Sequence, residues 1–175
     1  GTGIEASGAA HQITVGGLTD VSIASNGDNA IYAADGANVN LNGGASLDVT
    51  GQNTTTGIAA DGGTVTVSGG QAIIKAATTG DDQSAYALSG ENNGSVTVSA
   101  DSVKLTAKTT TGDAAAINNE GTGTIGVTAG DEGVELTASS VNGEAQAISN
   151  SGTGKVTIAT TGQASFDVTG LSAVG

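Results

Sequence analysis

Short stretches of the chain alternate apolar and polar residues, and glycine, asparagine or aspartate separates one stretch from the next. Val65-Thr66-Val67 and Val103-Lys104-Leu105 are two examples, each with a polar residue between two aliphatic ones. Because successive side chains of a strand point to opposite faces, this period of two predicts short β-strands with one apolar face. Gly, Asn and Asp tolerate the left-handed backbone of tight corners, so they are suited to the places where the pattern breaks.

The predicted strands recur in sets of three. The first strand of each set opens on a large apolar residue with glycine four positions later, as in Ile58-Ala-Ala-Asp-Gly62. These strands begin at Ile4, Tyr32, Ile58, Tyr86, Ile117, Ile148 and Leu171, on average about 28 residues apart. The second strands begin at Ile13, Val39, Val65, Val96, Ile125 and Val156, and the third at Val21, Leu47, Ile74, Val103, Val134 and Phe166.

A period of three strands favours coiling over an antiparallel sandwich, which would not need every third strand to resemble the first. We therefore predict an all-β fold, a right-handed parallel β-helix (β-solenoid) with three strands per coil and about six coils. The right-handed form fits the variable, long repeat and the general rule for parallel crossovers. Residues 1–175 are expected to form one solenoid, as a fragment of a longer protein.

Outward residues of equivalent strands should stack into exposed ladders along the solenoid. In the second strands this ladder is Thr14, Asn40, Thr66, Thr97, Gly126 and Thr157; in the third it is Ser22, Asp48, Lys75, Lys104, Glu135 and Asp167. Lys104 should meet Glu135, Lys75 should lie beside Lys104, and Glu135 should neighbour Asp167. As a possible interaction surface the sequence offers Thr14, Asn40, Thr66, Thr97, Thr157, Asp48, Glu135 and Asp167.

Two places in the pattern leave alternatives open. Ile31 and Tyr32 compete for one inward position, since a slip of one residue exchanges the faces of a strand. Asn119 and Asn150 occupy a position where other repeats have small or apolar residues. If these amides point inward they should pair with each other, because an unpaired buried amide costs about 1–3 kcal/mol.

The composition excludes several classes of function. The chain has 17 acidic residues against four lysines and no arginine, for a net charge of −13, so it lacks the basic clusters that bind nucleic acid or anionic membranes. It has no cysteine, and no apolar run of membrane-spanning length. We expect neither nucleic-acid binding nor membrane insertion of this segment.

No catalytic, cofactor or metal site is predicted, and we expect no enzyme activity. Glycosidase-type chemistry needs two carboxylates close together, and the best predicted pair is Glu135 with Asp167. The lone His11 has no recognisable partner set. Corner clusters at Asp81-Asp82, Asp131-Glu132 and Asn26–Asn29 could bind calcium only weakly, since none has a known calcium-loop spacing. The threonine ladder is too irregular to predict ice binding.

Two segments, Ala30-Ile-Tyr-Ala-Ala-Asp-Gly-Ala-Asn-Val-Asn-Leu-Asn-Gly-Gly44 and Gly57-Ile-Ala-Ala-Asp-Gly-Gly-Thr-Val-Thr-Val-Ser-Gly-Gly70, resemble passenger domains of pertactin-like autotransporters. Similar Gly/Thr/Ala-rich solenoids occur in filamentous haemagglutinins and phage tailspikes. The resemblance implies export across the bacterial outer membrane and display at the cell surface, with roles in adhesion, biofilm formation and virulence.

The same resemblance implies the kind of partner. It would be a host surface or matrix molecule, a glycan, or another copy of the chain on a neighbouring cell. A structural stalk fits the same pattern. The alternative is a carbohydrate-active β-helix that binds or cleaves polysaccharide.

Overall fold

A computed structural model of the chain describes residues 2–17, 20–43, 46–52, 55–80 and 82–174. The described part is built from parallel β-strands and contains no helix. The strands form two sheets, which we call sheet A and sheet B.

Sheet A has seven strands in the order β1-β4-β7-β9-β11-β13-β16. Their bounds are β1 Ile4–Ser7, β4 Asn29–Ala34, β7 Thr56–Asp61, β9 Ala85–Glu91, β11 Ala114–Asn119, β13 Glu144–Asn150 and β16 Ser172–Val174. Sheet B contains β2 Gln12–Gly16, β3 Val21–Ser25, β5 Asn38–Asn42, β6 Ser46–Gln52, β8 Thr64–Thr78, β10 Ser95–Thr109, β12 Thr124–Ser140, β14 Lys155–Thr160 and β15 Ala164–Thr169. Every pairing between these strands is parallel.

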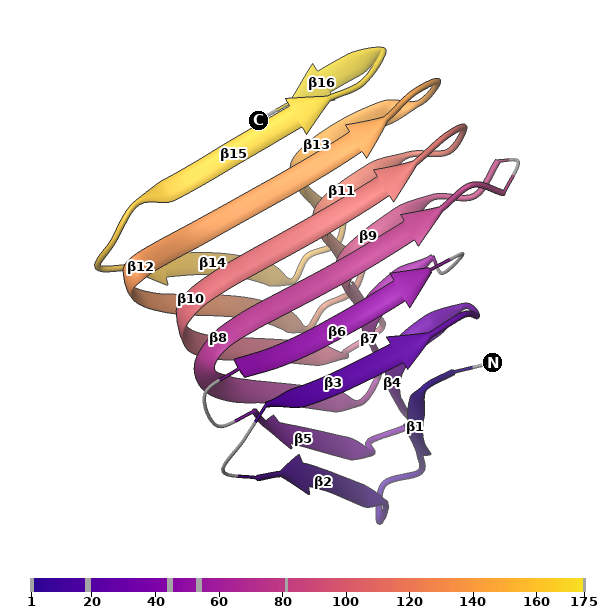
Figure 1. Cartoon of the computed structure of the whole chain (residues 1–175). Helices are drawn as coiled ribbons and strands as arrows, with labels where there is room; N and C mark the ends of the chain where they lie inside the picture. Colours follow the sequence, from indigo (N-terminus) through magenta and orange to yellow (C-terminus); the bar gives the residue numbers. More distant parts are fainter. Residues whose placement is uncertain (1, 18–19, 44–45, 53–54, 81, 175) are drawn as a thin grey trace.

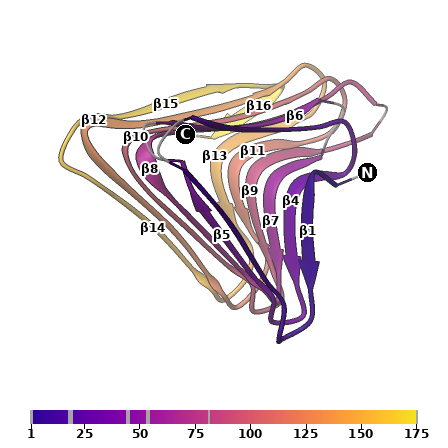
Figure 2. The same cartoon turned by 60° about the horizontal axis from the view of Figure 1, so that its bottom comes forward.

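The strands wind into a solenoid whose coils stack from the N-terminal to the C-terminal end (Figure 1). Seen from the N-terminal end, the chain turns clockwise as it recedes, which is the right-handed sense (Figure 2). The solenoid makes about five turns, close to the six coils predicted. The predicted all-β, right-handed parallel β-solenoid is therefore confirmed.

The second strands stack in the register that the sequence predicts. Ile13, Val39, Val65, Val96, Ile125 and Val156 are successive partners, and so are Thr14, Asn40, Thr66, Thr97, Gly126 and Thr157. Val39, Val65, Val96 and Ile125 are fully buried. The predicted register of the second strands is therefore confirmed.

The third strands differ from the prediction in two coils. Ile74 lies opposite Val49 and Leu105, and Phe166 lies opposite Leu136, so each is two residues from its predicted place. Ala72 and Ala164 take the places predicted for Ile74 and Phe166. Alanine is common on both faces of a strand, so it does not mark an inward position in the sequence. A shift of two residues keeps every side chain on its face, so the alternation of apolar and polar residues cannot reveal it.

In three coils the second and third strands are one bent strand. β8, β10 and β12 continue through the corners predicted at Ser68-Gly69-Gly70 and Ala129-Gly130-Asp131. The ladder of β10 with β12 shifts register between Ala100 and Ser102, where the strands bend. Small residues allow the bend while pairing with neighbouring coils goes on, so the predicted three strands per coil are two here.

The first strands contain a kink that breaks the period of two. Each of the inward residues Ile31, Ile58, Leu88 and Ile117 follows a small residue that is also buried. These small residues are Ala30, Gly57, Ala87 and Ala116, with Ala147 equivalent in β13. Two consecutive residues thus face the core, and the strand beyond the kink has its alternation reversed.

The structure settles one open position in the first strands and corrects two others. The kink decides between Ile31 and Tyr32 and displaces Tyr86, and Leu171 does not open a seventh first strand. Ile31, not Tyr32, takes the inward position opposite Ile4 and Ile58. Leu88, not Tyr86, is the next equivalent. Leu171 lies before β16 and is largely exposed, with its backbone N–H bonded to the Gly143 carbonyl. Both tyrosines therefore lie on the outer side of sheet A.

The predicted amide pairing is present. Asn119 is fully buried, and its Nδ2 donates to Oδ1 of Asn150 at 3.0 Å. Nδ2 of Asn150 in turn donates a hydrogen bond to the Gly154 carbonyl. Oδ1 of Asn119 has no partner, so the ladder satisfies one half of the buried amide and leaves the other half unsatisfied.

Coils approach so closely at one corner that only glycine fits. A Cβ placed on Gly123 would lie 1.8 Å from the carbonyl oxygen of Gly94 in the preceding coil. A Cβ on Gly126, three residues later in β12, would meet nothing within 4 Å. The two glycines thus have opposite steric surroundings in one coil.

Gly123→Ala should destabilise the protein by about 1–3 kcal/mol, since the added methyl forces the two coils apart. Gly126→Ala is the matched control and should leave stability unchanged or raise it slightly, because glycine weakens a strand. Urea unfolding followed by circular dichroism measures both. Equal unfolding midpoints for the two variants would contradict the close stacking.

Candidate functional site

The cross-section of the solenoid has three sides (Figure 2), and their outward residues differ in charge. Sheet A forms one side. The second side is formed by β2, β5, β14 and the first halves of β8, β10 and β12. The third is formed by β3, β6, β15 and the second halves of the long strands.

The second side is an almost uncharged surface of short side chains, which we call the uncharged face. Its three outward columns are Gln12, Asn38, Thr64, Ser95, Thr124 and Lys155; Thr14, Asn40, Thr66, Thr97, Gly126 and Thr157; and Gly16, Asn42, Ser68, Ser99, Thr128 and Ala159. Lys155, in the last coil, is the one charged residue among them. The predicted residues Thr14, Asn40, Thr66, Thr97 and Thr157 form its central column.

The third side carries mixed charges. Nζ of Lys104 lies 3.0 Å from Oε2 of Glu135, as predicted, and the two side chains are 48% and 49% exposed. An ion pair this exposed contributes about 0–1 kcal/mol. Three of the four lysines, Lys75, Lys104 and Lys108, lie on strands of this side.

Three neighbours predicted for this side are wrong, because of the shift of two residues. Ile73, not Lys75, lies between Asp48 and Lys104. Lys75 lies opposite Thr106. Glu135 faces Ser165, and Asp167 lies opposite Thr137. The best predicted carboxylate pair, Glu135 with Asp167, is therefore not a pair of direct neighbours, and Asp48, Glu135 and Asp167 do not form one ladder.

The outer surface of sheet A is concave, because the kink bends each of its strands toward the core (Figure 2). A cavity of about 170 Å³ lies in this hollow. It is lined by Tyr86, Asp113, Ala114, Ala115, Asn118, Glu120, Glu144, Gln146 and Ser149, which come from three successive coils. We call it the acidic groove.

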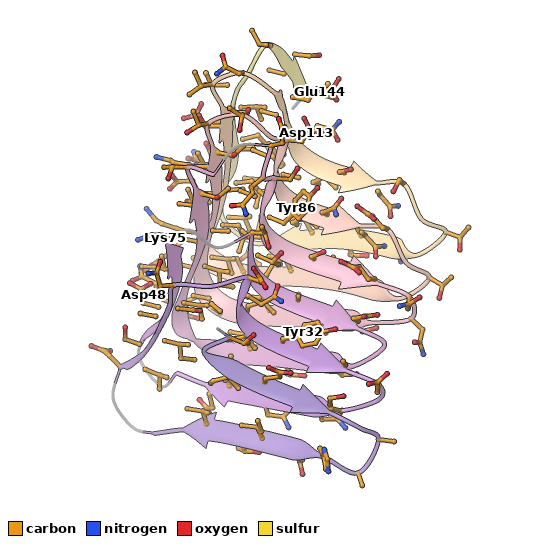
Figure 3. The ribbon with its side chains drawn as sticks, turned by 90° about the vertical axis from the view of Figure 1, so that its right-hand side faces the viewer. Tyr32, Asp48, Lys75, Tyr86, Asp113 and Glu144 are labelled. Atoms are coloured by element: carbon orange, nitrogen blue, oxygen red, sulfur yellow. The ribbon has the colours of Figure 1, made fainter. Side chains whose placement is uncertain are left out.

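The acidic groove has carboxylates at both ends of β11. Asp113 precedes the strand, and its Oδ1 accepts a hydrogen bond from the backbone N–H of Glu144 at 3.0 Å. Glu120 follows the strand, and its Oε1 accepts from Nδ2 of Asn118 at 2.9 Å. Tyr32, Tyr86, Asp113 and Glu144 lie one above another along the stack, away from Asp48 and Lys75 (Figure 3).

Carboxylates also stack from coil to coil beside the groove. Glu91 lies opposite Asp61, and the backbone N–H of Glu120 bonds the carbonyl of Gly90 next to Glu91. Partial burial raises the pKa of Glu91, and the charges of Asp61 and Glu120 raise it further. No lysine lies on a strand of sheet A to offset this repulsion.

Asp61, Glu91 and Glu120 follow one another from coil to coil, and we call them the acidic column. Tyr32 joins its N-terminal end. Its hydroxyl donates to Oδ2 of Asp61 at 3.1 Å. Burial, followed by this hydrogen bond and the nearby carboxylates, raises the pKa of Tyr32. Nδ2 of Asn92 donates to the other oxygen of Asp61. Asp61 is thus held by a neighbour on each side.

The described residues show no cluster of three or more His, Asp or Glu side chains arranged to hold a metal ion. Of the corner residues considered for calcium, Asp131 accepts a hydrogen bond from Thr161 and Asp82 is exposed. Asp81 lies outside the described residues. Nδ1 of His11 contacts the backbone oxygen of Ser7, within its own corner.

Sequence reasoning missed the acidic groove because its residues are not a motif. Asp113, Glu120 and Glu144 are scattered over 32 positions, and the hollow between them comes from the kink. The two tyrosines, Tyr32 and Tyr86, are the sequence feature that indicates an outer surface here, once they are assigned to the outer side of the strands.

Glu91→Gln should stabilise the protein at pH 7 and do so less at pH 4. A raised pKa means that the folded state binds the Glu91 proton more tightly than the unfolded state. The stability that comes with this proton is present below the ordinary value of 4.5 and is lost as pH rises through the folded-state pKa. Urea midpoints at the two pH values measure the effect.

Glu135→Gln is the matched control, because the carboxylate of Glu135 lies beside the ammonium of Lys104, whereas that of Glu91 lies beside other carboxylates. It should not stabilise the protein at pH 7. If Glu91→Gln also fails to stabilise the protein at pH 7, the carboxylates of the acidic column do not repel one another.

Comparison with known proteins gave no relative. No protein-family model matches the chain, and no curated protein or solved structure matches it. In the part of the chain that the structure describes, there is no helix of the length and apolarity required to cross a membrane. The functional inference below therefore stands on the three faces and on the resemblance noted in the sequence.

Proposed function

We propose that this chain is a surface-exposed segment of a bacterial autotransporter-type adhesin, and that it acts without enzymatic activity. In this role the solenoid is a stalk displayed outside the outer membrane, and one of its sides holds cells together by self-association. The resemblance to pertactin-like passengers supports the location. The uncharged face supports the mechanism and is the observation that carries the proposal.

Charge distribution favours the uncharged face as the contact surface. Two copies with a net charge of −13 repel each other, so association must use a side with few carboxylates. The three outward columns of the uncharged face contain none. By contrast, sheet A is bordered by the acidic column, and the third side includes Asp48, Glu135 and Asp167.

The side chains of the uncharged face suit contact between two identical surfaces. Hydroxyls and amides are both donors and acceptors, so two such faces can pair without a second kind of partner. Each hydrogen bond contributes only about 0.5–1.5 kcal/mol, but the stacked coils repeat the contact along the solenoid. Contacts that are weak singly and regularly repeated favour cell-to-cell adhesion through many copies.

Thr97→Asp places a carboxylate at the centre of the uncharged face and should weaken self-association about tenfold or more. Thr106→Asp is the matched control, since Thr106 is an outward threonine on the same strand but on the third side. Sedimentation velocity at increasing protein concentration measures both. Clumping of cells that display each variant gives the second readout.

Salt separates this mechanism from association driven by charge attraction. Raising the ionic strength screens the repulsion between two acidic copies, so wild-type self-association should strengthen. A wild-type chain that stays monomeric up to about 1 mM would contradict the proposal. So would equal loss of association in Thr97→Asp and Thr106→Asp.

A further inference from the structure

We propose that the acidic groove binds a linear polysaccharide that carries free amino groups. This inference goes beyond self-association and uses a different side of the solenoid. It starts from the cavity of about 170 Å³ between Tyr86 and the residues of the next two coils. Small-molecule sites are usually about 300–1,000 Å³, so this smaller hollow, with one aromatic ring and several convergent polar groups, holds one stretch of a chain and not a whole ligand.

The groove crosses the strands, and this direction excludes one common kind of ligand. Backbone N–H and C=O groups of β9, β11 and β13 already pair with the neighbouring coils. A peptide therefore cannot add to sheet A as a further strand within the groove. Recognition must come from side chains, and those present are a phenol, two amides, a hydroxyl and carboxylates.

These side chains match the groups of a sugar chain. Gln146 and Ser149 are partly exposed and offer donors and acceptors for ring hydroxyls, and Tyr86 offers a flat apolar surface. The lining residues recur at the spacing of the coils, about 4.8 Å, which is similar to the advance of a pyranose unit along an extended chain. A linear glycan lying along the solenoid axis would meet equivalent positions in successive coils.

The charge of the groove selects an amine-bearing glycan. Asp113, Glu120 and Glu144 line the cavity, and none of the lining residues is basic. Protonated amino groups on the sugar would offset these carboxylates, and an ammonium over the ring of Tyr86 gains a cation–π attraction. A polysaccharide that carries carboxylates or sulfates would be repelled.

A buried hydroxyl on the same surface lacks a partner. Ser89 is 1% exposed, and its Oγ makes no hydrogen bond. The adjacent residue Leu88 points into the core, so Ser89 lies on the outer side of sheet A, opposite Asn118 of the cavity lining. The Ser89 hydroxyl is thus a hydrogen-bonding group without a protein partner, in the coil next to the Asn118 that lines the cavity.

Calorimetric titration with a hexamer of β-1,4-linked glucosamine tests the inference. We expect binding, and we expect the N-acetylated hexamer, which has the same backbone without charge, to bind about tenfold more weakly. Asp113→Asn combined with Glu144→Gln should weaken binding of the glucosamine hexamer by a similar factor. Tyr86→Ala should weaken it too, while Tyr86→Phe keeps the ring and should bind nearly as well as wild type.

The matched control is Glu135→Gln combined with Asp167→Asn, which removes the same net charge from the third side. It should change the affinity less than about twofold. Circular dichroism checks that all variants fold. Equal weakening by the two double variants would overturn the inference, and so would binding of hexalysine as tight as that of the glucosamine hexamer. No binding of the glucosamine hexamer at about 1 mM would do the same.

Discussion

The structure depends on parallel stacking of equivalent strands from one coil to the next. A coil of this chain buries mainly small and medium aliphatic side chains, and there is no tryptophan or methionine to fill a core. Alone it could not offset the conformational entropy of about 1–2 kcal/mol per ordered residue. Stacked coils cover one another's inward residues and pair one another's backbone groups, so stability is a property of neighbours.

Stacking also determines how the surface is made. Each outward position of one coil becomes a column along the solenoid, and each side of the cross-section collects columns of one kind. The sequence of this chain uses that property to separate its charges. One side is uncharged, one carries most of the lysines beside some carboxylates, and one is acidic. The two proposed activities use different sides and need not interfere.

The sequence predicted the fold class, the handedness and the full register of the second strands, where all six coils carry two aliphatic residues around one outward residue. It also predicted the Lys104–Glu135 pair and the amide contact between Asn119 and Asn150. It failed where the local pattern has no information. A shift of two residues leaves every side chain on the same face of the sheet, so the alternation could not predict which residues lie beside Lys75 and Asp167.

The kink beside Ile58 and Leu88 breaks the alternation, so the pattern leaves Ile31 and Tyr32 as alternatives and assigns Tyr86 to the place that Leu88 takes. The acidic groove follows from the same kink and was not predicted for that reason. The predicted central column of the uncharged face is correct as geometry.

The stacking register of the coils is tested most directly by a distance between two spin labels. The chain has no cysteine, so Thr14→Cys with Thr157→Cys gives a doubly spin-labelled protein without background. Because these positions are five coil spacings apart in one column, pulsed electron paramagnetic resonance should give a distance of about 24 Å. A broad distance distribution would contradict the stacked solenoid. So would a mean distance that differs from this value by more than the length of the label side chains allows.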